Sequence, residues 1–232
     1  MKARIAWTGK PEASGQDAIR DPISHTVFTA DNSYRAALGS GAWRRLKPEI
    51  RRRFSVKPRA GQRIRYTGVM QTVELSCMGW LFAQACRLIG TPLATCRGVD
   101  VPMRIELVPD EELGGVAWLR SYDFAANKRF TVRSTKCRGS KGEFVEHIGC
   151  GFSMRLELRE RHGDLVFTSI AYEVTLFERT YRIPDILTPG VTTVKHEQQA
   201  GDRFRFSLSV DHPLLGRTIY QDGVFYSDVR DV

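Results

Sequence analysis

The sequence predicts an α+β fold dominated by antiparallel β-structure, in which a meander of long strands curls into a barrel or half-barrel. From about residue 101 onward, one strand-like segment follows another, and glycine-rich turns separate them. The clearest segment runs from Cys150 to Glu160, where apolar residues alternate with small or charged ones. A period of two places each set on one face of a strand. One buried and one wet face are typical of antiparallel sheets.

The N-terminal part is predicted to be different from the rest. Residues 1–32 mix Gly, Pro, Ser and charged residues without a regular period, which indicates an extended or mobile arm. Residues 33–232 are expected to form a single β-rich domain. Two short helices open it, over residues 34–38 and 48–54. In the second helix Ile50 and Phe54 lie four residues apart and are expected to face inward.

The first long strand is predicted over Arg63–Leu75, and an apolar helix over Cys77–Ile89 follows it. A helix that is apolar almost all round needs cover on most sides. It can pack on or in the barrel as a core helix, close an open end as a lid, or dip into a membrane surface beside the basic segment described below.

The later strands are separated by short turns, which is the pattern of a meander. The segment from residue 165 to 181 is unusually long for one strand and is expected to bend or coil. These strands are predicted at Val101–Val108, Val116–Phe124, Arg129–Cys137, Glu143–Gly149, Gly151–Glu160, Leu165–Tyr181, Val191–Lys195, Phe204–Val210 and Arg217–Tyr226.

The charge of the chain is concentrated in one segment. Residues 44–65 contain ten cationic residues and one acid, Glu49, so they account for the whole net charge of +9. A local cationic patch can attract an anionic partner or a membrane surface. Nucleic acid is not expected, because few aromatic residues lie among the cations. The core of the predicted patch is Arg44, Arg45, Arg51, Arg52 and Arg53.

Several functional classes lack their usual signals. The N-terminus has no secretory signal pattern, no apolar run is long enough for a transmembrane helix, and the five cysteines suit a reducing compartment, so we expect a cytoplasmic location. The histidine and cysteine spacings give no metal site, and no Gly-x-Ser-x-Gly or dinucleotide-binding loop occurs. We therefore predict no catalytic residue, cofactor or metal.

The strongest candidate for binding is Arg120. It shares a strand face with Trp118, Tyr122 and Phe124, which favour burial. A buried guanidinium needs an anion. That anion can be a ligand carboxylate or phosphate bound in bidentate fashion, or a structural partner such as Glu173 or Glu146.

Five phrases of the sequence, taken in order, resemble one bacterial family. They are Arg52-Arg53-Phe54, Gly68-Val69-Met70, the segment from Trp118 to Phe124, Glu146-His147-Ile148-Gly149 and the segment from His212 to Gly216. The family is the uncharacterised "domain of unknown function 4166", which is sometimes fused to saccharopine-dehydrogenase-like or short-chain reductase domains. The resemblance covers roughly residues 33 to 228. It implies an architecture and supplies no catalytic residue.

Three functions follow as hypotheses. The preferred one is non-catalytic binding of an apolar or acidic amphipathic small molecule in a barrel cavity. The second is an enzyme of the lyase, isomerase or hydrolase type with a carboxylate–arginine pocket, which predicts a carboxylate of strongly raised pKa. The third is an interaction module that uses residues 44–65, which predicts binding that weakens steeply with salt.

Overall fold

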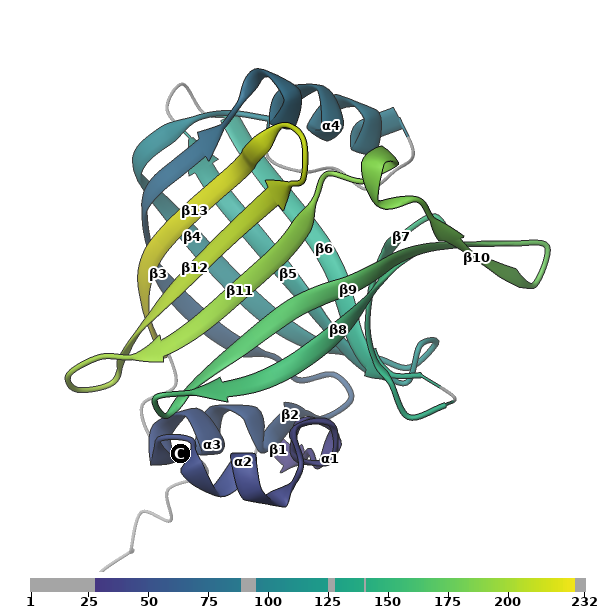
Figure 1. Cartoon of the computed structure of the whole chain (residues 1–232). Coiled ribbons are helices and arrows are strands. Elements are labelled where there is room, and N and C mark those ends of the chain that lie inside the picture. Colours follow the sequence, from purple (N-terminus) through teal and green to yellow (C-terminus); the bar gives the residue numbers. More distant parts are fainter. Residues whose placement is uncertain (1–27, 89–94, 125–127, 140, 228–232) are drawn as a thin grey trace, which may run out of the picture.

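The computed structural model describes residues 28–88, 95–124, 128–139 and 141–227. These residues form a closed antiparallel β-barrel with helices at both of its ends (Figure 1). The predicted barrel is therefore confirmed, and it closes completely. In the orientation of Figure 1 we call the end that carries α4 the upper end and the end that carries α1–α3 the lower end.

Ten strands make the ring, and β8 pairs with β9 to close it, with Leu158 opposite Phe167. Side chains alternate between the inside and the outside of such a barrel. In their order around the ring the strands are β9 (Asp164–Leu176), β11 (Val191–Gln198), β12 (Arg203–His212), β13 (Gly216–Ser227), β3 (Ile64–Leu75), β4 (Gly98–Asp110), β5 (Gly115–Phe124), β6 (Lys128–Arg138), β7 (Phe144–Gly149) and β8 (Phe152–Arg161).

One predicted strand is wrong. The segment from residue 165 to 181 is a hairpin, in which β9 turns back into β10 (Arg179–Ile183), and β10 pairs only with β9 among the described strands. The turn residues Phe177 and Glu178 have φ angles of 48° and 64°. Non-glycine residues seldom adopt this left-handed conformation, so the sequence carries no ordinary turn signal here.

Three short helices cover the lower end, namely α1 (Ser33–Leu38), α2 (Ser40–Arg45) and α3 (Pro48–Phe54) (Figure 1). Beside them, β1 (Phe28–Ala30) pairs with β2 (Val56–Pro58). Most of the predicted arm, residues 1–27, lies outside the described residues. The helices α1 and α3 were predicted from the sequence, whereas α2 was not.

The helices of the lower end fill the barrel from below. Phe54 of α3 is buried, and its ring centroid lies 5.0 Å from that of Tyr34, 5.0 Å from His196, 5.9 Å from Phe167 and 6.4 Å from Trp118. Inward rings of β5, β9 and β11 thus pack directly against rings that the helices supply. The lower half of the interior is consequently a close-packed aromatic core.

The apolar helix α4 (Cys77–Leu88) lies across the upper end (Figure 1), close to its predicted range, while Gly90 and Pro92 beyond it lie outside the described residues. A short 3-10 helix, η1 (Asp185–Leu187), lies near it. The start of α4 is anchored on β13, because Ser76 N donates to Thr218 O at 2.9 Å. A Cβ on Gly79 would lie 2.0 Å from the same oxygen, so only glycine permits this approach. The expectation that α4 is covered on most sides is wrong, since its outer face is exposed.

Candidate ligand-binding cavity

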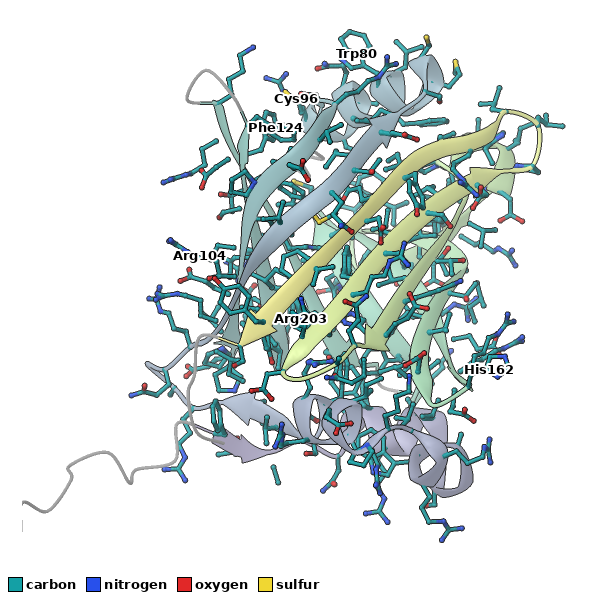
Figure 2. The ribbon with its side chains drawn as sticks, turned by 90° about the vertical axis from the view of Figure 1, so that its left-hand side faces the viewer. Trp80, Cys96, Arg104, Phe124, His162 and Arg203 are labelled. Carbon is teal, nitrogen blue, oxygen red and sulfur yellow. The ribbon has the colours of Figure 1, made fainter. Side chains whose placement is uncertain are left out.

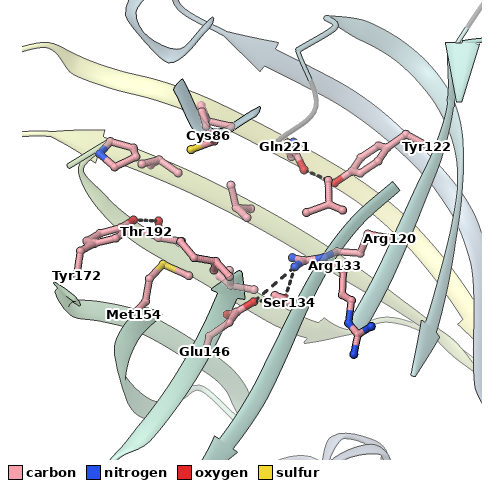
Figure 3. Close-up of a pocket in the computed structure, with 17 residues that line it drawn as sticks. Cys86, Arg120, Tyr122, Arg133, Ser134, Glu146, Met154, Tyr172, Thr192 and Gln221 are labelled. Atoms are coloured by element: carbon pink, nitrogen blue, oxygen red, sulfur yellow. Dashed lines mark hydrogen bonds and ion pairs between the residues drawn. The ribbon is translucent and has the colours of Figure 1, made fainter. Parts of the chain in front are cut away.

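The upper half of the barrel holds a cavity beneath α4, in contrast to the packed lower half (Figure 3). Its volume is about 110 Å³, several times the ~10–15 Å³ that one water molecule needs. Residues from β5 to β9, from β11 to β13 and from α4 line it. The apolar part of the lining includes Val132, Ile148, Met154, Val194, Leu208 and Ile219.

A cluster of charged residues forms the polar side of this cavity. Arg120 Nη2 donates to Ser134 Oγ at 2.5 Å and lies 3.5 Å from Glu146 Oε1 (Figure 3). Ser134 Oγ in turn donates to Glu146 Oε1 at 2.5 Å. Lys136 Nζ lies 3.0 Å from the same oxygen, Oε1, and 4.7 Å from the Trp118 ring centroid. Two cations therefore share one carboxylate.

All three charged side chains of the cluster are largely removed from water, with exposed fractions of 12% for Arg120, 7% for Glu146 and 8% for Lys136. Burial alone would raise the pKa of the Glu146 carboxyl, but the charges of Lys136 and Arg120 and the Ser134 hydrogen bond outweigh burial and lower the pKa to about 2. For Lys136, burial lowers the pKa of the ammonium group and the charge of Glu146 opposes that shift. With all three groups ionised, the cluster carries one net positive charge inside the barrel.

One nitrogen of this cluster lacks a hydrogen-bond partner. The buried Nε of Arg120 has no hydrogen-bond partner among the described residues. Because a buried donor without a partner costs about 1–3 kcal/mol, this atom marks a place where an additional acceptor would stabilise the structure.

Two neutral pairs line other walls of the cavity. The hydroxyl of Tyr122 donates to Gln221 Oε1 at 2.8 Å, and the hydroxyls of Tyr172 and Thr192 are hydrogen-bonded at 2.7 Å (Figure 3). Burial raises the pKa of Tyr122, and it raises the pKa of Tyr172 to about 12. Both phenols are therefore neutral near pH 7. They add polar points to an interior that is otherwise apolar and cationic.

Residues 46–225 match the family described as Domain of unknown function (DUF4166). The chain belongs to this family. The matched range contains α3, α4 and all of the barrel strands except the last two residues of β13. No curated protein and no solved structure matches the chain. The match confirms the family resemblance that the sequence showed. The family description names no activity.

The structure places some of the predicted site residues at the cavity and others elsewhere in the barrel. Arg120, Tyr122 and Glu146 line the cavity together. Trp118 also faces inward, but it belongs to the lower aromatic core. Phe124 is buried and stacks on Tyr122 with a centroid distance of 5.9 Å, and it is not among the residues that line the cavity.

Glu173 is not the partner of Arg120, which corrects the prediction. Its carboxylate pairs with Arg155 at 2.9 Å. The register between β8 and β9 shifts so that Arg155 is opposite Ala171 while Leu156 is opposite Ser169. The extra residue, Ile170, is a β-bulge that reverses the alternation, which brings Tyr172 to the cavity and turns Glu173 away from it.

Sequence reasoning missed Ser134, Tyr172, Thr192 and Gln221 as cavity residues. Ser134 carries a usable signal, because it alternates with the inward Val132 on β6. Gln221 carries the same kind of signal, because it alternates with the buried Ile219 and Phe225 on β13. Tyr172 follows the register shift on β9, so simple alternation does not identify its face.

The basic segment lies at the lower end, and much of its charge is already engaged. Arg45 pairs with Glu160 at 2.7 Å, Lys47 pairs with Asp164 at 2.8 Å, and Arg63 and Arg65 both approach Glu106. The other end of the barrel carries α4 (Figure 1), so the idea that this helix enters a membrane beside the basic segment is wrong.

Of the five predicted patch residues, Arg53 does not belong to a surface patch. Its guanidinium carbon lies 3.9 Å from the centroid of the Phe204 ring, and Nη2 donates to Gln198 Oε1 at 2.9 Å. Burial lowers its pKa to about 10. Arg44 and Arg52 are exposed and Arg51 is half-buried, so the cationic surface is smaller than the sequence indicated.

The described residues contain no group of three or more His, Cys, Asp and Glu that could hold a metal ion. Within the same residues, no helix has the length and apolar character needed to cross a membrane.

Proposed function

We propose that this domain binds an acidic amphipathic small molecule in its barrel without converting it chemically, and that the acid group of the ligand contacts Arg120. One observation carries the proposal. Arg120 and Lys136 share a single carboxylate, Glu146, and Arg120 and Glu146 line a largely apolar chamber, in which the Nε of Arg120 has no partner among the described residues. A ligand carboxylate or phosphate would neutralise the remaining charge and accept from the guanidinium.

The rest of the chamber suits the apolar part of such a ligand. Aliphatic side chains of Val132, Leu208 and Ile219 line the walls, and Cys86 of α4 lies at the top (Figure 3). The charged cluster lies deeper in the barrel than α4 does. The ligand would therefore enter with its acid group first and leave its apolar end beneath the helix.

An enzyme of the lyase, isomerase or hydrolase type has less support. Such a mechanism needs a group that takes up or releases a proton near neutral pH. The pKa of Glu146 is lowered to about 2, so the carboxylate is a weak base and holds no proton to donate. The carboxylate of raised pKa that this hypothesis predicted is thus not found at Glu146.

An interaction module that docks through residues 44–65 also has less support, because Arg45, Lys47 and Arg65 already have acidic partners within the chain. The cytoplasmic location expected from the sequence stays a prediction.

The proposal is tested by native mass spectrometry of gently purified protein, followed by solvent extraction and identification of any bound acid. The test variant is Arg120→Met, and the matched control is Arg104→Met, which removes an arginine from the outer surface of β4 (Figure 2). We expect bound ligand in the wild type and in the control, and its loss in Arg120→Met. Recovery of no acidic ligand, or equal amounts from both variants, would contradict the proposal.

A further inference from the structure

The helix α4 turns an apolar face to water. Trp80 and Leu81 are 45% and 50% exposed, and Figure 2 shows Trp80 on the side of the helix away from the barrel. The opposite face of α4 packs on the barrel through Gly79 and Ala83, which are buried, while Cys86 lines the cavity. A surface helix ordinarily has its polar residues toward solvent. Here the barrel covers the inner face, and Trp80 and Leu81 are exposed on the outer part of the helix beside one polar pair, Gln84 and Arg87, whose side chains are hydrogen-bonded at 3.1 Å.

Two neighbouring elements add to this exposed surface, and His212 holds them together. Its Nε2 is 3.2 Å from Ile186 O of η1, and its Nδ1 accepts hydrogen bonds from the backbone of Leu214 and Leu215 at 3.1 and 3.2 Å. The His212 ring lies 6.2 Å from the Phe82 ring of α4. The exposed residues of the three elements form one surface, which we call the apolar end: Trp80, Leu81, Ile186, Leu187, Leu214 and Leu215.

The charges around the apolar end are mostly cationic where they adjoin α4. Arg87 of α4, Arg97 and Arg217 are exposed, and residues 77–88, 95–97 and 213–217 contain no acid. The acids near this surface are Glu74 at the end of β3, Asp185 of η1, which is 3.3 Å from Arg182, and Asp211, which is 3.4 Å from Arg217. An apolar centre that includes a tryptophan, with arginines at its border, matches the interfacial region of an anionic bilayer, where indole rings lie at the headgroups and arginines meet lipid phosphates.

We propose that the apolar end docks on the surface of an anionic phospholipid bilayer, and that the amphipathic ligand exchanges with that bilayer past α4. The docking part stands on the exposed side chains and their charges. The exchange part rests on the proposed function, because the cavity beneath α4 is the chamber for which we propose an acidic amphipathic ligand. Such molecules partition strongly into lipid. Contact between the bilayer and the end of the barrel that holds the cavity would therefore favour transfer of the ligand between the two.

The docking is tested by flotation with vesicles of phosphatidylcholine and phosphatidylglycerol. The test variant is Trp80→Ser with Leu81→Ser. The control, Leu113→Ser with Tyr226→Ser, removes a leucine and an aromatic residue that are 39% and 49% exposed, from the opposite end of the barrel. We expect the wild type and the control to float with the vesicles, and the test variant to bind about tenfold more weakly, because two half-exposed apolar side chains no longer enter the lipid.

A second readout does not depend on the double variant folding. Brominated lipids should quench part of the tryptophan fluorescence of the wild type, and the single substitution Trp80→Phe should remove that part. The variant Arg120→Met separates the two proposals, since it should lose ligand and keep vesicle binding. The docking proposal is overturned if the wild type does not bind vesicles, or if the test and control variants lose binding equally. It is also overturned if sedimentation shows a dimer of the wild type and of the control that the double variant Trp80→Ser with Leu81→Ser does not form.

Discussion

The two halves of the barrel interior are enclosed by the same ten strands and yet are filled differently. In the lower half, rings from α1 and α3 meet inward rings of the strands at centroid distances of 4.9 to 6.4 Å. In the upper half, the helix α4 lies across the opening, and about 110 Å³ stays open beneath it. A ring of about eight strands is just filled by its own side chains. Ten strands enclose more space, so the half without inserted rings keeps a cavity.

The largest effect is expected at the charged cluster of the upper half. Replacing Glu146 by Gln leaves Arg120 and Lys136 buried without a shared anion, and we expect a loss of about 3–5 kcal/mol in the free energy of unfolding at pH 7. The control Glu106→Gln removes a carboxylate that pairs with arginines at the surface, and it should cost less than about 1 kcal/mol. Urea denaturation measures both.

The difference in the free energy of unfolding between wild type and Glu146→Gln should depend on pH. The pKa of Glu146 is about 2 in the folded protein against an ordinary value of 4.5. A lowered pKa means that the carboxylate stabilises the fold above about pH 4.5 and that this contribution is lost as the pH falls toward 2. The difference between wild type and Glu146→Gln should therefore shrink below pH 4.5. The buried His196, whose lowered pKa also makes acid destabilising, is present in both proteins and does not affect the difference. A difference that stays constant down to pH 2.5 would show that Glu146 does not hold the buried cations.

The next prediction compares matched isoleucines of the two halves. Ile50 of α3 is fully buried in the lower core, whereas Ile219 of β13 borders the cavity. We expect Ile50→Ala to cost about 4 kcal/mol and Ile219→Ala about 2 kcal/mol, because a side chain beside an open space has fewer packing partners to lose. Chemical denaturation of both variants gives the values. Equal costs would indicate that the upper half is packed as closely as the lower half.

The smallest stability effect concerns added volume. Val132 faces the cavity, and Val116 faces the lower half on the neighbouring strand. Val116→Phe should cost about 1–3 kcal/mol through overpacking, and Val132→Phe should cost less than about 1 kcal/mol while it blocks ligand binding. Thermal unfolding and a binding assay on each variant separate these outcomes. Equal destabilisation by the two substitutions would remove the distinction between the halves.

The sequence was sufficient for those features that depend on regular alternation. The antiparallel barrel and the inward position of Arg120 follow from a period of two residues. Features that depend on irregular backbone were not predictable. The turn at Phe177 and Glu178 lacks glycine, and the bulge at Ile170 reverses the face of Glu173. The choice of Glu146 as the partner of Arg120 also depends on the pairing of β6 with β7, which only the assembled ring defines.

The central claim, that the cationic cluster selects the acid group of an apolar guest, is tested most directly by calorimetric titration with octanoic acid, octanol and octylamine. These probes share a chain and differ in the headgroup. The account predicts that the acid binds at least about tenfold more tightly than the alcohol, that the amine does not bind, and that Arg120→Met removes the preference. Equal affinity for the three probes, or a preference that survives in Arg120→Met, would contradict it.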